Sequence, residues 1–262
     1  MNRISSALII IMLTMASSAR PMTFEALTDS VLAVRQAQFE AAGDMSFDAV
    51  LNEKETDGKG KVKKLEKYDK KIRVKKFGDS LLIKEEYLSY YIDDEKQSDR
   101  ELAKKVQKKT DEKKKRRGRD LAYDLTEPLQ LKNRQSYETF YDGIADSLID
   151  GFVCHKLRAE ARQDIDTLID ALYYIDTASY HPVRIDFRPA KLVKKLMFRL
   201  SDFKMTLQYK PFNDKIWLPY HFEIKGKGRA ALFVSVNFEA EETYFNPVIN
   251  SGLADSLFLQ TK

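Results

Sequence analysis

The sequence predicts a mainly β protein of the α+β class, in which an antiparallel sheet turns one apolar face toward a helical cover. The clearest pattern lies between residues 180 and 245, where apolar and polar residues alternate at period two, as in half-buried strands. Val183, Ile185 and Phe187 share one side of the first run. Because the later runs are joined by short turns, we expect neighbouring strands to form a β-meander.

The N-terminal residues have the pattern of a secretory signal peptide. Arg3 precedes an apolar run at 4–15, and small residues follow at 16–19. The apolar run is too short to span a membrane, which takes about 20 residues. We therefore expect a signal peptide at 1–19 and an exported, soluble chain at 20–262 that folds as one domain.

The first elements after this segment are a helix and three strands. Apolar residues at helical spacing predict a helix over 23–42, with Thr23 as its N-cap. Alternation then predicts strands at 45–51, 68–77 and 81–92. The candidate core residues of the last two strands are Ile72, Val74, Ile83 and Tyr87.

A charged insertion follows at about 94–120. From Lys104 to Arg119 it holds ten basic residues and two acidic ones, whereas the whole chain has a formal charge of only +5. Because the positive charge is local, the composition does not indicate a nucleic-acid partner. Few apolar residues favour a solvated, loosely helical insertion. The alternative is transient contact of Lys104–Arg119 with anionic lipid head groups, each basic residue adding about 1 kcal/mol.

Further strands are predicted in the second half of the chain. Residues 152–161 and 168–175 alternate and are expected to pair with each other before the strand that contains Val183. The side of the strand that carries apolar residues changes between Leu200 and Phe203, which predicts a β-bulge near residues 201–202. A bulge there would curve the sheet.

The sequence offers no catalytic motif. It lacks a Gly-x-Ser-x-Gly elbow, a His-Glu-x-x-His helix, a phosphate-binding loop and a Cys-x-x-Cys pair. His155, His181 and His221 have no metal-ligand spacing, and Cys154 is the only cysteine. We therefore predict no enzymatic activity, no metal and no cofactor, and a packed structural role for Cys154. The many large apolar residues from Phe203 to Phe238 form either an ordinary core or, in part, the lining of a cavity.

Four short motifs, in this order, resemble a known family. They are Asp-Gly-Phe-Val-Cys-His-Lys-Leu at 150–157, Tyr-Tyr-Ile-Asp at 173–176, Pro-Val-Arg at 182–184 and Ile-Trp-Leu-Pro at 216–219. With the export signal, the first helix and the meander, they resemble the outer-membrane lipoprotein-sorting proteins of the LolA/LolB-like superfamily. The resemblance implies an incomplete, strongly curved β-barrel lidded by helices. It also implies a periplasmic carrier for lipids or lipoproteins, whose acyl chains lie on the concave apolar face.

The charged insertion departs from the compact pattern of that family. Two alternatives to a carrier stay open: an exported structural or interaction module with a filled core, and an outer-membrane β-barrel. Under the carrier hypothesis, the residues expected to line the lipid-binding cavity are Phe203, Met205, Leu207, Ile216, Leu218, Tyr220, Phe222, Val234, Val236 and Phe238.

Overall fold

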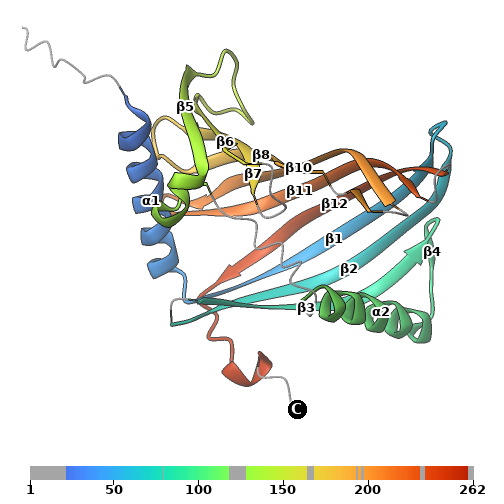
Figure 1. Cartoon of the computed structure of the whole chain (residues 1–262). Helices are drawn as coiled ribbons and strands as arrows, with labels where there is room; N and C mark the ends of the chain where they lie inside the picture. Colours follow the sequence, from blue (N-terminus) through green and yellow to red (C-terminus); the bar gives the residue numbers. More distant parts are fainter. Residues whose placement is uncertain are drawn as a thin grey trace, which may run out of the picture.

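The computed structural model describes residues 22–78, 80–117, 128–163, 168–192, 194–195, 198–230 and 234–258. The signal peptide expected at 1–19 lies outside these ranges. Within them the chain forms one antiparallel sheet of twelve strands in the order β4-β3-β2-β1-β12-β11-β10-β8-β7-β6-β5, with β9 beside β10. The two ends of this order do not pair, so the sheet is twisted but not closed (Figure 1). The predicted mainly β class is confirmed.

Two meanders build the sheet. The first runs through β1 (Asp44–Asp57), β2 (Val62–Phe77), β3 (Ser80–Ile92) and β4 (Glu95–Lys96). The strands of the second are β5 (Tyr137–Ile144), β6 (Cys154–Ala161), β7 (Ile169–Asp176), β8 (Pro182–Pro189), β9 (Lys194–Lys195), β10 (Phe198–Asn213), β11 (Ile216–Ala230) and β12 (Val234–Ile249). Because β12 pairs with β1, the end of the chain joins the two meanders into one sheet.

The predicted meander and bulge are confirmed. β10, β11 and β12 pair in sequence order, and the β10–β11 register shifts between Leu200 and Asp202. One core residue was predicted wrongly, since Ile83 is 65% exposed while its cross-strand partner Val74 is buried. The reason is that Ile83 lies in a part of β3 that has a neighbouring strand on one side only.

A row of directly paired residues shows which side chains share a face. Paired residues in an antiparallel ladder point to the same side of the sheet. From β5 to β3 the row is Tyr141, Leu157, Tyr173, Ile185, Leu207, Phe222, Glu242, Leu51, Tyr68 and Tyr90. We call the face that carries this row the inner face and the opposite one the outer face.

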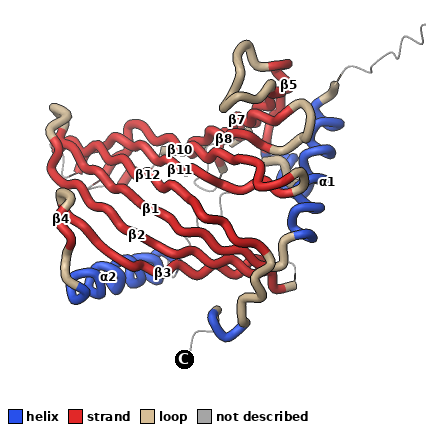
Figure 2. The backbone as a smooth tube through the Cα atoms, turned by 180° about the vertical axis from the view of Figure 1, so that it is seen from behind, coloured by secondary structure: helices blue, strands red, loops and turns tan. Residues whose placement is uncertain are grey.

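Two α-helices cover the two ends of the inner face. α1 (Phe24–Ala41) begins at its N-cap Thr23, whose Oγ1 accepts a hydrogen bond from the Ala26 amide at 3.2 Å, as predicted. α2 (Asp99–Arg117) lies along β3, at the far end from α1 (Figure 1). The view from behind shows the sheet from its other side, with α2 next to β3 (Figure 2). Short 3₁₀ turns at Leu131–Ser136 and Asp255–Leu257 complete the described structure.

The helix α2 differs from the loosely helical insertion expected at this position. It forms because Ala, Leu, Lys, Gln, Glu and Arg, which dominate its sequence, are good helix formers. Its Leu102 packs against Leu51, Tyr68 and Tyr90, so the insertion is docked on the sheet rather than solvated on all sides.

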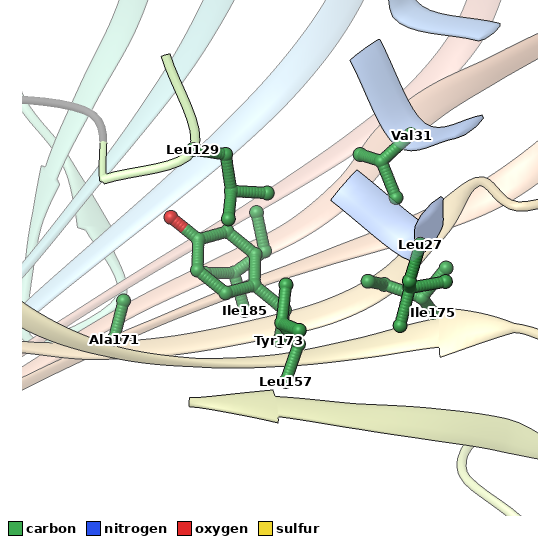
Figure 3. Packing of buried hydrophobic residues seen from close by; sticks show 8 residues of the cluster. All are labelled: Leu27, Val31, Leu129, Leu157, Ala171, Tyr173, Ile175 and Ile185. Atoms are coloured by element: carbon green, nitrogen blue, oxygen red, sulfur yellow. The ribbon is translucent and has the colours of Figure 1, made fainter. Parts of the chain in front are cut away.

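The principal core lies under α1. Leu27 and Val31 project from the helix toward β6, β7 and β8, and both are fully buried (Figure 3). Burying such a side chain contributes about 1.5–3 kcal/mol. The buried cluster consists of Leu27, Val31, Leu129, Leu157, Ala171, Tyr173, Ile175 and Ile185. Among the described residues, no helix is long and apolar enough to cross a bilayer.

Candidate functional site

An apolar strip crosses the middle of the inner face, between the parts that α1 and α2 cover. Leu207 of β10 pairs with Phe222 of β11, and both side chains are only half-buried. In the same row, Ile185, which pairs with Leu207, is 6% exposed, and Leu51, which pairs with Glu242 beyond Phe222, is 9% exposed. We define the apolar strip as Met205, Leu207, Phe222, Ile224 and Ala240, which are joined by direct cross-strand pairing or lie two residues apart on one strand.

A hollow of about 360 Å³ opens between this strip and α2, and we call it the α2 hollow. Phe222, Ile224 and Ala240 of the strip form one wall, and Lys109 of α2 reaches its opposite side. Such a space, apolar on one side and charged on the other, suits an amphiphile better than a fully polar ligand. Its lining residues are Leu51, Glu53, Lys70, Glu85, Tyr87, Lys109, Phe222, Ile224, Ala240 and Glu242.

The charges of the α2 hollow are paired with one another. Lys70 is only 2% exposed, and its Nζ lies 2.6 Å from Glu242 Oε1 and 3.5 Å from Glu85 Oε1. Lys109 Nζ donates to both carboxylate oxygens of Glu53, at 2.8 and 2.9 Å. An unpaired charge beside the apolar strip would carry a large desolvation penalty, so this pairing allows charged and apolar residues to share one hollow.

A second hollow, of about 270 Å³, lies between α1 and the strands. Gln38 of α1 fixes the helix there, because its side chain donates to the Trp217 carbonyl at 2.8 Å and accepts from the Trp217 amide at 3.0 Å. The His181 ring stacks on Trp217 with centroids 5.4 Å apart. The lining residues are Arg35, Gln38, Phe39, Ala42, Met45, Leu81, His181, Pro182, Tyr209 and Trp217.

The structure brings some of the predicted lining residues together. Met205, Leu207 and Phe222 belong to the apolar strip. Phe203 and Phe238 lie on the same face farther along the strands, with ring centroids 6.1 Å apart. Gly226 pairs with both of them, and a Cβ at this position would lie 2.2 Å from the Phe238 ring, so only glycine leaves room for the ring.

Ile216 and Leu218, among the other predicted residues, do not join the strip. Ile216 and Leu218 are 6% and 5% exposed and pack on Phe47, so they belong to a filled part of the core. Val234 and Val236 are in β12, but their side chains lie outside the described part of the structure.

Tyr220 is placed on the outer face, contrary to the alternation that put it beside Phe222. The β10–β11 register shifts between Gln208 and Tyr209, and Tyr220 is the extra residue of β11 at this shift. Its side chain therefore no longer lies on the same face as that of Phe222. Its hydroxyl donates to Asp150 Oδ2 at 3.1 Å, and the Gln208 amide donates to the same oxygen at 2.7 Å. Burial, with the neighbouring Asp150 carboxylate, raises the pKa of Tyr220 to about 12.

The charged residues of the α2 hollow were not predicted. Period two offered one signal, because the apolar side of β12 continues from Phe238 and Ala240 to Glu242, and that of β1 continues from Leu51 to Glu53. A carboxylate at the end of an apolar run indicates either the edge of the core or a buried ion pair. Nothing local distinguishes the two, because the partner lysines come from β2 and α2.

The remaining reactive groups are packed. Cys154 is fully buried beside Val183 and Trp217, and burial raises the pKa of its thiol to about 12, so it is protonated at neutral pH. His155 Nδ1 lies 3.0 Å from the Tyr141 hydroxyl. Within the described ranges, no group of three His, Cys, Asp or Glu side chains is placed to hold a metal ion.

Comparison with known proteins gave matches among solved structures alone. No family model and no curated protein matches the chain. A DUF1329 family protein from Desulfovibrio piger is similar at 14% identity and a TM-score of 0.46, over 90% of this chain and 97% of that one. A putative outer membrane lipoprotein-sorting protein domain from Vibrio parahaemolyticus is similar at 12% identity and 0.42, over 90% and 97%. A LolA superfamily protein from Nitrosomonas europaea is similar at 11% and 0.35, over 88% and 97%.

Proposed function

We propose that this protein is a periplasmic carrier that binds the acyl chains of lipids or lipoproteins on its inner face and delivers them toward the outer membrane, without enzymatic activity. The observation that carries the proposal is the apolar strip, whose Leu207 and Phe222 are half-buried although Ile185 and Leu51 in the same row are buried. The strip opens on the α2 hollow of about 360 Å³. The export signal predicted at 1–19 and the four sequence motifs support the periplasmic part of the proposal.

The strip and the hollow suit reversible binding. Each CH₂ group removed from water contributes about 0.8 kcal/mol, so a partly enclosed chain gains several kcal/mol without becoming trapped. The charged wall beside Lys70 and Lys109 leaves a polar position for the end of the chain that bears the head group. A ligand held in this way would exchange with a membrane when the hollow opens.

Native mass spectrometry of the mature protein, purified gently from the periplasm, tests the proposal when it is followed by solvent extraction and lipid analysis. We expect adducts of lipid mass. The double variant Leu207→Gln/Phe222→Gln should lose them while its circular dichroism stays that of the wild type. The matched control is Leu148→Gln/Phe212→Gln, because these side chains are 62% and 46% exposed and lie outside the hollow.

Two outcomes would contradict the carrier function. The first is a wild-type protein that stays empty when it is purified and when it is offered lipids or acylated peptides, which would favour an interaction module with a filled core. The second is equal loss of adducts in the control and in the strip variant. In that case any bound lipid would be held elsewhere on the surface.

A further inference from the structure

A pair of glutamates on the inner face lies under α2. Glu53 of β1 and Glu66 of β2 are direct cross-strand partners. Like charges in this position destabilise a ladder unless other groups neutralise them. Lys105 Nζ lies 2.6 Å from Glu66 Oε1, and Lys109 Nζ lies 2.8 Å from Glu53 Oε1. The helix therefore supplies two of the countercharges that this position in the sheet requires.

The spacing of the two lysines matches the spacing of the two glutamates. Lys105 and Lys109 are four residues apart and so lie on one side of the helix. Each ammonium group also lies over a tyrosine ring, at 5.5 Å from the Tyr90 centroid and 4.4 Å from the Tyr68 centroid. These two rings stack at 4.9 Å. The two carboxylates and the two tyrosine rings together form a binding site for cations, and the two lysine ammonium groups of α2 occupy it.

Apolar contact contributes little to the attachment of α2. Leu102 is the residue of α2 that packs into the cluster of Leu51, Tyr68 and Tyr90, and Val106 is half-buried. On the exposed side of the helix, Arg100, Lys104 and Lys108 outnumber Asp99 and Glu101, and Lys104 Nζ lies 2.8 Å from Glu101 Oε1. The helical sequence then continues with five further basic residues at 113–117. A helix of this composition is attracted to an anionic lipid surface.

We propose that α2 is a lid over the α2 hollow, latched by the ion pairs Lys105–Glu66 and Lys109–Glu53 and released when an anionic membrane surface competes for its lysines. This inference rests on the proposed carrier function and specifies its regulation: the hollow opens at the membrane where cargo is exchanged. The anionic surface shifts the equilibrium because it interacts with the freed helix more strongly than with the docked one.

The resting latch is tested by hydrogen–deuterium exchange over residues 102–111. The variant Lys105→Gln/Lys109→Gln should exchange about tenfold faster than wild type, since local opening is governed by the contacts that opening breaks. Raising the salt concentration should speed exchange in wild type and have little effect in this variant. The charge-matched control is Lys59→Gln/Lys61→Gln in the exposed β1–β2 turn, which should exchange as wild type does. Equal protection in the latch variant and the control would overturn the proposal.

A charge swap shows whether the ion pair itself holds the helix. Glu53→Lys and Lys109→Glu should each speed exchange, and the double variant Glu53→Lys/Lys109→Glu should recover most of the lost protection. An unfolded protein could not regain protection at α2, so recovery in the double variant supports the ion pair even if one of the single variants is unstable. If the effects of the two single substitutions simply add in the double variant, so that no protection is recovered, the latch is contradicted.

Vesicles supply the membrane arm of the test. Phosphatidylcholine vesicles that contain phosphatidylglycerol should speed exchange of α2 and uptake of a fluorescent fatty acid, whereas phosphatidylcholine alone should not. Lys104→Gln/Lys108→Gln should weaken the response to the anionic vesicles. If the fatty acid binds but anionic vesicles do not change the hydrogen–deuterium exchange of α2, the latch is wrong and the carrier function still holds. If anionic vesicles speed the exchange of α2 but no fatty acid is taken up, the carrier function is contradicted.

Discussion

At the β6–β8 end of the inner face, α1 buries Leu27 and Val31 completely, whereas at the β1–β3 end α2 contributes Leu102 and two lysines. The same sheet therefore carries one helix held by apolar packing and another held largely by charge. Apolar packing changes little with pH or salt, but ion pairs respond to both. The comparison indicates that the α1 end is a fixed core and that the α2 end can respond to its surroundings. Between them lies the strip that neither helix fully covers.

The largest expected effect is at the α1 end. Leu27→Ala removes a fully buried side chain from the principal core, so we expect a loss of about 2–5 kcal/mol in the free energy of unfolding. Leu102→Ala, at the α2 end, should lose much less, because α2 has few apolar contacts. Urea denaturation of both variants measures the difference. Equal losses would show that the two ends are held in the same way.

The second prediction concerns Gly226, which lies farther along the inner face than the strip and pairs with Phe203 and Phe238. Gly226→Val places atoms where the Phe238 ring lies, since even a Cβ would approach it to 2.2 Å. Overpacking of this kind typically costs about 1–3 kcal/mol, and the displaced ring should also alter acyl-chain binding. Thermal denaturation and titration with a fluorescent fatty acid check the two parts. A variant as stable as wild type, with unchanged affinity, would show that this part of the face is open and unused.

The third prediction concerns acidic pH, which should weaken the attachment of α2 before that of α1. Burial alone would raise the pKa of Glu66, but hydrogen bonds from Lys105, Lys64 and Tyr90 outweigh it and lower the pKa from 4.5 to about 2. Because the folded-state pKa is depressed, the stabilisation is present above pH 4.5 and is lost as the pH falls toward 2.

We therefore expect exchange at α2 to accelerate between pH 4.5 and 2, after correction for the intrinsic pH dependence of exchange, while α1 keeps its protection longer. Glu66→Gln should remove most of this pH dependence at α2. Simultaneous loss of protection at both helices in the wild type would argue against separate attachment.

The smallest effect is expected on the outer face. Tyr220→Phe removes the hydroxyl that donates to Asp150, so the loss should be about 0.5–1.5 kcal/mol. Fatty-acid affinity should not change, because Tyr220 does not belong to the apolar strip. A clear loss of fatty-acid affinity in a titration would contradict the placement of Tyr220 on the outer face and would favour the inner face that alternation predicted.

Much of the fold was predictable because strand periodicity is a local property. The runs around Val183 and Phe222 became β8 and β11, and the change of apolar side near Leu200 marked a real bulge. Tyr220 shows the limit of the same rule. A second register shift, at Gln208, follows no change of pattern that the sequence displays, yet it reverses the side on which a residue lies.

The candidate site was less predictable, because its character depends on contacts between distant segments. Alternation identified Leu207 and Phe222 as inner-face residues, but whether they are covered depends on where α1 and α2 dock. Lys109 and Glu53 are 56 residues apart, and each looks like an ordinary surface charge until the helix lies on the sheet. A basic segment therefore predicted solvent exposure, although Lys105 and Lys109 pair with Glu66 and Glu53 of the sheet.

Photo-crosslinking with a fatty acid that carries a diazirine near the end of its chain tests the central claim most directly. Mass spectrometry of the digested protein identifies the labelled residues. The account predicts that label concentrates on Met205, Leu207, Phe222, Ile224 and Ala240, and that an unlabelled fatty acid competes it away. Label on the exposed Leu148 and Phe212 at equal yield, or label that resists competition, would contradict the assignment of the inner face as the site that holds acyl chains.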